Sequence, residues 1–222
     1  MKAVIFDFDG TLTQKGENLW KAIFKTLGYD VVSSKGEYKT QFRDFLSGKI
    51  NYQEWCDQTC DSYRQRNFTQ EMLFDLASKI KLIDGVDKVF KTLYKKDIKI
   101  CVVSGNFIDV IKYALKDLTN YVSSINANIV EFNNQKIISK IYGTDYDFEG
   151  KAKFISRYCK DNNIKPEDVW FVGNGDNDEW AHMSGCHTLC VNPDKTDPND
   201  RQKWHYSIEN MQSLVEILPI IT

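Results

Sequence analysis

Two aspartates follow a short apolar run close to the start of the chain. Residues 3–6 read Ala-Val-Ile-Phe, and Asp7, Asp9 and Gly10 come directly after them. An apolar run of this length that ends near a glycine is typical of a buried parallel strand. The carboxyl ends of such strands are where open α/β sheets bind their ligands. Because two crowded carboxylates need a counter-charge, the pair predicts a site for a divalent cation such as Mg²⁺.

Polar residues also follow two later apolar runs. Ser104 and Gly105 come after Val102-Val103, and the segment Gly173–Asp178 comes after Phe171-Val172. A serine hydroxyl and a glycine N–H at a helix N-terminus suit the oxygens of a phosphate group. The glycine-spaced Asn and Asp residues of the second segment suit a metal ion that prefers oxygen ligands. Lys151, at the start of a predicted helix, would supply a positive charge for the phosphate.

Each of these features has an ordinary structural explanation when it is taken alone. Asp-Gly is common in turns, Ser104 could cap a helix, and Lys151 could be a solvated lysine of a first helical turn. Several such features at predicted strand ends favour a shared functional site over separate structural roles.

The elements that must position these residues come mainly after residue 82. Apolar strands there alternate with amphipathic helices, a pattern that predicts a parallel sheet with helices on both faces. Two turn-forming asparagines between β-branched runs predict a hairpin. The predicted strands are 98–103, 121–125, 169–172 and 188–191, the hairpin is 128–141, and the helices are 107–118, 151–161, 177–184 and 210–218.

Residues 16–81 have a different pattern, with four predicted helices and no strand. Leu19 begins an apolar stripe that ends at Gly28, residues 42–46 mark a second helix, and Asn51 and Thr69 are candidate N-caps for two more. The predicted fold class is therefore α/β, with a Rossmann-like parallel core formed by residues 1–15 and 82–222. The helical residues 16–81 form an inserted domain.

The composition limits the classes of partner. The chain has 222 residues, a net charge of −2 and 42% hydrophobic residues. This charge gives no long-range attraction for nucleic acid or acidic membranes, and no apolar stretch reaches membrane-spanning length. A cytoplasmic protein that binds neither partner is predicted, with its six cysteines as reduced thiols.

The polar segments resemble, in their order, the motifs of the haloacid dehalogenase-like phosphatase superfamily. The similarity covers roughly residues 2–191 and is greatest to the phosphoserine phosphatase branch, whose four-helix C1 cap corresponds to residues 16–81. The matching positions are Asp7, Asp9, Gly10, Thr11, Ser104, Gly105, Lys151 and the Gly173–Asp178 segment.

The resemblance implies a role for each matching residue. Asp7 would be the nucleophile that forms an aspartyl-phosphate, and Asp9 would act as general acid and then as general base. The residues implied to hold the phosphoryl group are Thr11, Ser104, Gly105 and Lys151. The implied ligands of Mg²⁺ are Asp7, the backbone carbonyl of Asp9, Asn174 and Asp178.

This sequence departs from the branch at two places. The residue that corresponds to Asn174 is an aspartate in the phosphoserine phosphatases. In this sequence Asp176 or Asp178 would have to supply the negative charge that Asn174 lacks. The cap arginine that grips the substrate carboxylate in those enzymes has no clear counterpart. Arg64 or Arg66 could replace it, and Glu17 could meet a substrate amine.

The implied activity is hydrolysis of a small phosphorylated metabolite with Mg²⁺, and phosphoserine is one candidate substrate. Two alternatives stay open at this point. A phosphotransferase or mutase would pass the phosphoryl group to an alcohol, and a non-catalytic regulatory protein would keep the fold without turnover.

Overall fold

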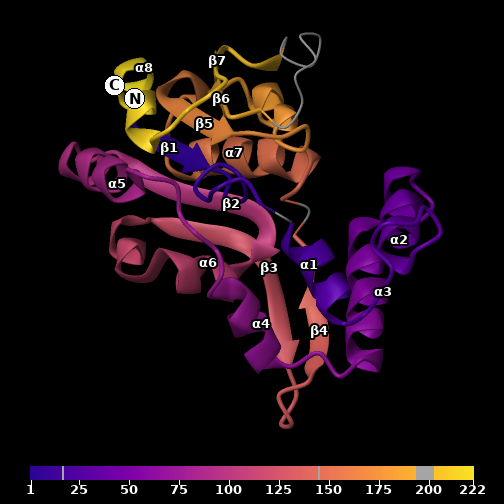
Figure 1. Cartoon of the computed structure of the whole chain (residues 1–222). Helices are drawn as coiled ribbons and strands as arrows, with labels where there is room; N and C mark the ends of the chain where they lie inside the picture. Colours follow the sequence, from indigo (N-terminus) through magenta and orange to yellow (C-terminus); the bar gives the residue numbers. More distant parts are fainter. Residues whose placement is uncertain (17, 145, 194–202) are drawn as a thin grey trace.

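A seven-stranded sheet lies at the centre of the computed structural model, which describes residues 1–16, 18–144, 146–193 and 203–222 (Figure 1). The strand order is β4-β3-β2-β1-β5-β6-β7. All neighbouring strands run parallel except β3 and β4, which form an antiparallel pair. The strands are β1 Ala3–Phe6, β2 Lys99–Phe107, β3 Ser124–Phe132, β4 Ile138–Tyr142, β5 Val169–Gly173, β6 His187–Val191 and β7 Tyr206–Ile208.

Helices cover both faces of the sheet. Successive residues of β1 point to opposite faces, so Val4 and Phe6 belong to one apolar cluster and Ala3 and Ile5 to another. The first cluster includes residues of α5 (Val86–Lys95), α6 (Ile108–Leu115) and α8 (Leu218–Ile221); the second includes residues of α7 (Glu149–Asp161). The predicted α/β class with a mainly parallel sheet is confirmed.

The register of β1 brings distant parts of the chain together at one edge of the sheet. Phe6 pairs with Val102 of β2 on one side and with Val172 of β5 on the other. The residues that follow these three positions therefore lie side by side at the carboxyl end of β1. Asp7 is held there by its own N–H, which donates to the Val172 carbonyl at 2.9 Å.

Four helices lie between β1 and α5, as the sequence predicts: α1 Leu19–Thr26, α2 Glu37–Leu46, α3 Tyr52–Gln65 and α4 Gln70–Ala77. Asn51 and Thr69 are the predicted N-caps of α3 and α4, and each accepts a hydrogen bond from the backbone of its helix. Asn51 also forms a reciprocal capping box with Glu54. Gly28, with a φ of 77°, follows the end of α1.

The four helices share their apolar core with the β3–β4 pair. One cluster joins Trp20, Trp55 and Tyr63 of the helices to Val130 and Ile141 of the strands. Figure 1 shows α3 beside β4, on the side of the sheet away from α8 and the chain termini. The inserted helices are thus packed on the strand pair and do not form a bundle with a separate core.

Several elements differ from the sequence prediction. The strand predicted at 121–125 and the first arm of the hairpin are one strand, β3, which pairs with β2 along its first half and with β4 along its second. The helices predicted at 177–184 and 210–218 are instead the short 3₁₀ turns Glu179–Ser184 and Leu214–Ile217, the second followed by α8. The sequence reading missed α5 and β7.

All six cysteines are free and buried in the structure. Among the described residues no helix is both long and apolar enough to cross a membrane.

Candidate active site

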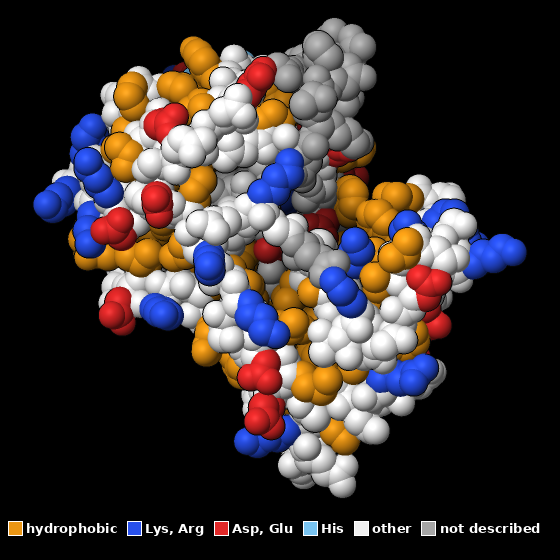
Figure 2. All heavy atoms as spheres, in the orientation of Figure 1, with side chains coloured by type: hydrophobic (Ala, Val, Ile, Leu, Met, Phe, Trp, Pro, Cys, Tyr) orange, Lys and Arg blue, Asp and Glu red, His pale blue; other side chains and the backbone are white. Residues whose placement is uncertain are grey.

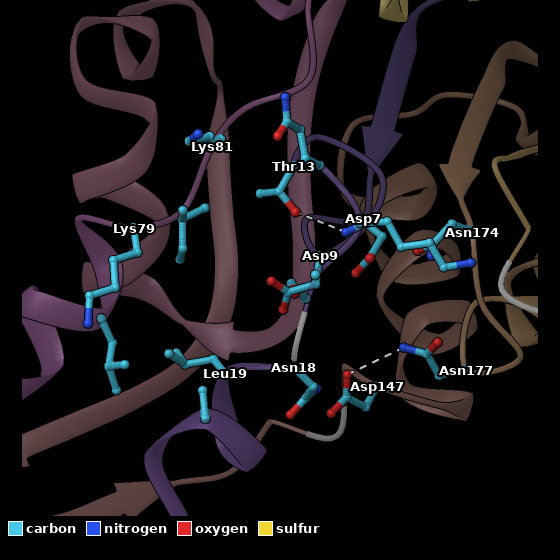
Figure 3. Close-up of a pocket in the computed structure, with 18 of the residues that line it drawn as sticks. Asp7, Asp9, Thr13, Asn18, Leu19, Lys79, Lys81, Asp147, Asn174 and Asn177 are labelled. Atoms are coloured by element: carbon cyan, nitrogen blue, oxygen red, sulfur yellow. Dashed lines mark hydrogen bonds between the residues drawn. The ribbon is translucent and has the colours of Figure 1, made fainter. Parts of the chain in front are cut away.

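Asp7 and Asp9 line one cavity of about 600 Å³ at the carboxyl edge of the sheet (Figure 3). The chain turns sharply after Asp9, because the N–H groups of three successive residues, Thr11–Thr13, donate to the Phe8 carbonyl. Gly10 allows this turn with a φ of 76°, and a Cβ atom there would lie 2.5 Å from the Asn174 amide nitrogen. The turn therefore requires glycine.

Lys151 lies behind Asp7, in the first turn of α7. Its Nζ atom is 2.9 Å from the Asp7 carboxylate, contacts Asp178 as well, and is fully buried. Burial alone would lower the pKa of Lys151, but the Asp178 and Asp7 carboxylates raise it above its ordinary value. Lys151 is therefore a fixed positive charge next to Asp7.

Asp178 holds the loop that follows β5. One of its carboxylate oxygens accepts hydrogen bonds from the N–H groups of Asn174 and Gly175, at 2.9 and 3.0 Å, and the other contacts Lys151. Gly173 leaves room for this carboxylate, since a Cβ atom at that position would lie 2.6 Å from it. In this arrangement Asp178 is a positioning residue, because its contacts fix the lysine and the loop.

Asn174 lines the cavity, and Thr11 orients its side chain. The Thr11 hydroxyl donates to the Asn174 Oδ1 atom at 3.2 Å. Thr11 itself is buried and does not belong to the described cavity lining. Asp176 is exposed and also lies outside that lining.

Ser104, near the end of β2, lines the same cavity, whereas Gly105 is outside the described lining. The Gly105 carbonyl accepts hydrogen bonds from the Trp20 indole at 3.0 Å and the Asn128 amide at 2.6 Å. Trp20 belongs to α1, so this bond fastens an inserted helix to the edge of the sheet. A Cβ atom at Gly105 would lie 1.9 Å from the Asp147 carboxylate, which excludes larger residues here.

Two further polar residues of the site have no role assigned from the sequence. The Asn106 amide donates to both Asp9 oxygens, at 2.9 and 3.1 Å. Asp147 lines the cavity beside Gly105, and its carboxylate accepts a hydrogen bond of 3.5 Å from Asn177 (Figure 3). Asn106 directly follows the Ser-Gly pair, so its position was a usable signal. Asp147 lies outside any strand or helix, and no sequence signal pointed to it.

The sheet end of the cavity holds more carboxylates than Lys151 alone can neutralise. Burial raises the pKa of Asp7 well above its ordinary value, and the Asp178 carboxylate raises it further. Burial also raises the pKa of Asp9 to about 6; the Asn106 hydrogen bond opposes this rise, and the Asp147 carboxylate adds to it. A cation bound next to these two carboxylates would lower both pKa values.

The donor atoms suit a hard divalent cation. Asp7 and Asn174 line the cavity and carry side-chain oxygen atoms, and Mg²⁺ binds through one or two carboxylates while it keeps several waters. Among the described residues no group of three or more His, Cys, Asp or Glu side chains is arranged to hold a metal ion. A metal here would therefore also use the Asn174 amide and backbone oxygens, with Asp7 as its main charged ligand.

The raised pKa of Asp9 predicts how the stability of the metal-free protein depends on pH. Because the folded-state pKa, about 6, lies above the unfolded value of 3.8, folding favours the protonated carboxyl. The free energy of unfolding of the wild type relative to Asp9→Asn should therefore fall by about 2 kcal/mol between pH 4 and pH 7. Urea unfolding of both proteins in EDTA, at pH 4 and at pH 7, measures this change. If the difference in the free energy of unfolding between the two proteins did not change with pH, the raised pKa of Asp9 would be wrong.

Of the predicted substrate residues in the inserted helices, those that the structure describes do not line this cavity. Glu17 lies outside the described residues. Arg64 is exposed on α3, pairs with Asp61 on the same helix, and is not part of the described lining. The basic residues that line the cavity are lysines: Lys15, Lys25, Lys79 and Lys81.

Comparison with known proteins gives one family. A model of the haloacid dehalogenase-like hydrolases matches residues 1–181. A phosphoserine phosphatase of Archaeoglobus fulgidus is 26% identical over 178 residues, which cover 80% of this chain and 48% of the relative. Another, from Lactococcus lactis, is 26% identical over 138 residues and 60% of each chain. This chain thus matches about half the length of these relatives.

A third phosphoserine phosphatase, from Campylobacter jejuni, is 24% identical over 185 residues, which cover 80% of this chain and 81% of the relative. Two solved structures have the same fold. One is described as a phospho-aspartyl intermediate analogue of phosphoserine phosphatase, with a TM-score of 0.76, 22% identity and coverage of 100% and 99% of the two chains. The other is a substrate-bound phosphoserine phosphatase complex, with a TM-score of 0.76, 21% identity and coverage of 100% and 98%.

Proposed function

We propose that this chain, which belongs to the haloacid dehalogenase-like hydrolases, is a Mg²⁺-dependent phosphatase that hydrolyses a small phosphorylated metabolite through an aspartyl-phosphate. One observation carries the proposal. Asp7 lies beside the buried cation of Lys151, and Asp9 lines the same cavity. Phosphoryl transfer needs a placed nucleophile, a placed acid and positive charge near the phosphorus, and these residues supply them.

In the first step, an oxygen of Asp7 attacks phosphorus and the bond between phosphorus and the ester oxygen breaks. Asp9 donates its proton to the departing oxygen, which leaves as an alcohol. A pKa of about 6 suits this role, because an acid of that strength is partly protonated near neutral pH. Asn106 keeps the Asp9 carboxyl in place through its two hydrogen bonds.

In the second step, water attacks the phosphorus of the aspartyl-phosphate. Asp9, now a carboxylate, takes a proton from that water, and the Asp7 carboxylate and inorganic phosphate are released. Ser104, the Gly105 N–H and Lys151 bind the phosphoryl oxygens in both steps. We assign Thr11 an indirect role, since its hydroxyl holds Asn174.

Mg²⁺ would be held by Asp7, Asn174 and the backbone carbonyl of Asp9, and it would neutralise phosphoryl charge. Residues 16–81 would form the cap that covers the cavity and excludes water during the first step. The bond from the Trp20 indole to Gly105 supports this role, because it links α1 to the phosphoryl-binding edge.

Removal of the metal is expected to abolish turnover. Treatment with EDTA should lower the hydrolysis of p-nitrophenyl phosphate at least about 100-fold, because Asp7 and the phosphate would then repel each other. Addition of excess Mg²⁺ should restore it. Full activity in EDTA-treated, metal-analysed protein would contradict the metal requirement.

A phosphatase screen tests the proposed function itself. Hydrolysis of p-nitrophenyl phosphate and of a panel of amino-acid, amine, sugar and nucleotide monophosphates would be followed by phosphate release with Mg²⁺. Phosphoserine belongs in this panel because the relatives named above are phosphoserine phosphatases. No turnover of any member would overturn the proposal, and phosphate transfer to an added alcohol in place of water would assign the reaction to a phosphotransferase.

A further inference from the structure

The cavity that contains Asp7 and Asp9 continues away from the sheet between α1 and α4. Its walls there are apolar and come from Leu19 and Ala22 of α1 and from Leu76 and Ile80. At about 600 Å³ the whole cavity is in the range of sites that bind drug-sized molecules. It is larger than a phosphorylated three-carbon compound would fill.

The two ends of this cavity have opposite charge. The acidic residues of the described lining, Asp7, Asp9 and Asp147, are at the sheet edge. Lys79 and Lys81 lie on the other side of Asp9 from Asn174 and Asn177 (Figure 3). Lys15 and Lys25 belong to the same lining. Figure 2 shows Lys and Arg side chains around the hollow in the middle of this face.

The backbone that carries these two lysines is fixed. The Lys81 carbonyl accepts a hydrogen bond of 2.8 Å from the Gln14 N–H, and Thr13 forms an isolated bridge with Leu82. The Lys79 N–H donates to the Leu76 carbonyl at 3.1 Å, directly after α4. Within the described part of the chain neither ammonium group has an ion-pair partner. Both charges therefore remain for a ligand.

We propose that the substrate carries a second anionic group, a carboxylate or a phosphate, joined to its phosphomonoester by a short apolar segment. The phosphoryl group binds at Asp7, the apolar segment lies against Leu19 and Leu76, and Lys79 or Lys81 binds the second anion. This inference rests on the proposed function, because it places the phosphoryl group at Asp7.

The choice of an anion follows from the chemistry of the two ends. Lysine ammonium groups are compact point charges that accept carboxylates and phosphates alike. Both lysines are exposed, so a neutral tail would leave their ammonium groups in solvent and gain no charge interaction from them. A short substrate that fills the sheet end alone would make no contact with Lys79 or Lys81 and would gain nothing from them.

Binding of non-hydrolysable phosphonates tests the inference without turnover. Calorimetry with Mg²⁺ would compare three matched series with two to six methylene groups: alkylphosphonates, phosphonoalkanoates and alkane bisphosphonates. At least one member of an anionic series should bind about tenfold more tightly than its neutral counterpart, the ratio expected for one hydrogen-bonded charge pair. The two anionic series distinguish a carboxylate from a phosphate.

The double variant Lys79→Gln/Lys81→Gln should remove this preference. The charge-matched control is Lys88→Gln/Lys95→Gln on α5, two exposed lysines outside the cavity, and it should keep the preference. Three results would overturn the inference. Neutral and anionic tails could bind equally, no phosphonate could bind at all, or the preference could survive in the Lys79/Lys81 variant. Hydrolysis of p-nitrophenyl phosphate in the same preparations separates these outcomes from failure of the proposed phosphatase activity.

Discussion

Replacement of Asp7 by asparagine is expected to lower the kcat for p-nitrophenyl phosphate by about 10⁴-fold or more. An amide nitrogen cannot attack phosphorus, so the covalent route is lost and only the binding groups of the site remain. The amide oxygen of asparagine can still accept the hydrogen bond from Lys151, which now reaches the Asp7 carboxylate at 2.9 Å. The loss should therefore appear in turnover and not in the fold.

Thermal unfolding and phosphonate binding provide the control for this variant. Asp7→Asn should unfold cooperatively and still bind an alkylphosphonate, since Ser104, Gly105 and Lys151 are unchanged. Its stability near neutral pH should equal or exceed that of the metal-free wild type, because the replacement removes a carboxylate whose ionisation burial disfavours. Retention of a tenth or more of wild-type turnover would rule out Asp7 as the nucleophile.

Replacement of Lys151 by methionine is expected to damage both activity and stability. The side chain is fully buried and contacts Asp7 and Asp178, so its loss leaves two buried carboxylates without their cation. Breaking a buried ion pair in this way costs about 3–5 kcal/mol. Turnover should fall about 10³-fold, because the phosphoryl group loses its fixed positive charge. Urea unfolding and steady-state kinetics measure the two effects.

The double variant Lys151→Met/Asp178→Asn separates the two roles of the lysine. Removal of the second carboxylate should recover part of the lost stability, since fewer buried charges remain unpaired. Activity should not recover with it. If the double variant were as unstable as Lys151→Met alone, the ion pair with Asp178 would not be what stabilises the folded state.

The core of the site could be predicted from sequence because its residues immediately follow buried strands. The β1 strand is fully buried, and its register with β2 and β5 places the residues after Phe6, Val102 and Val172 at one edge. Ligand binding at the carboxyl ends of the strands is a general property of open parallel sheets. The helix caps at Asn51 and Thr69 were predictable for a similar reason, because capping depends on residues close in sequence.

The residues that the sequence did not reveal depend on contacts between distant segments. Asp147 belongs to no strand or helix, and its place beside Gly105 results from tertiary packing. Lys79 and Lys81 look like ordinary surface lysines until the cavity between α1 and α4 is known. The role of Asp178 was assigned to metal binding from the resemblance, whereas in the fold its oxygens contact Lys151 and two backbone N–H groups.

Identification of the phosphorylated residue tests the central claim most directly. The enzyme would be mixed with a phosphomonoester and Mg²⁺, quenched in acid, and reduced with borohydride, which converts an aspartyl-phosphate to homoserine. Peptide mass spectrometry should then find homoserine at position 7 in the wild type and none in Asp7→Asn. Rapid turnover without modification at position 7, or modification at another residue, would contradict the mechanism.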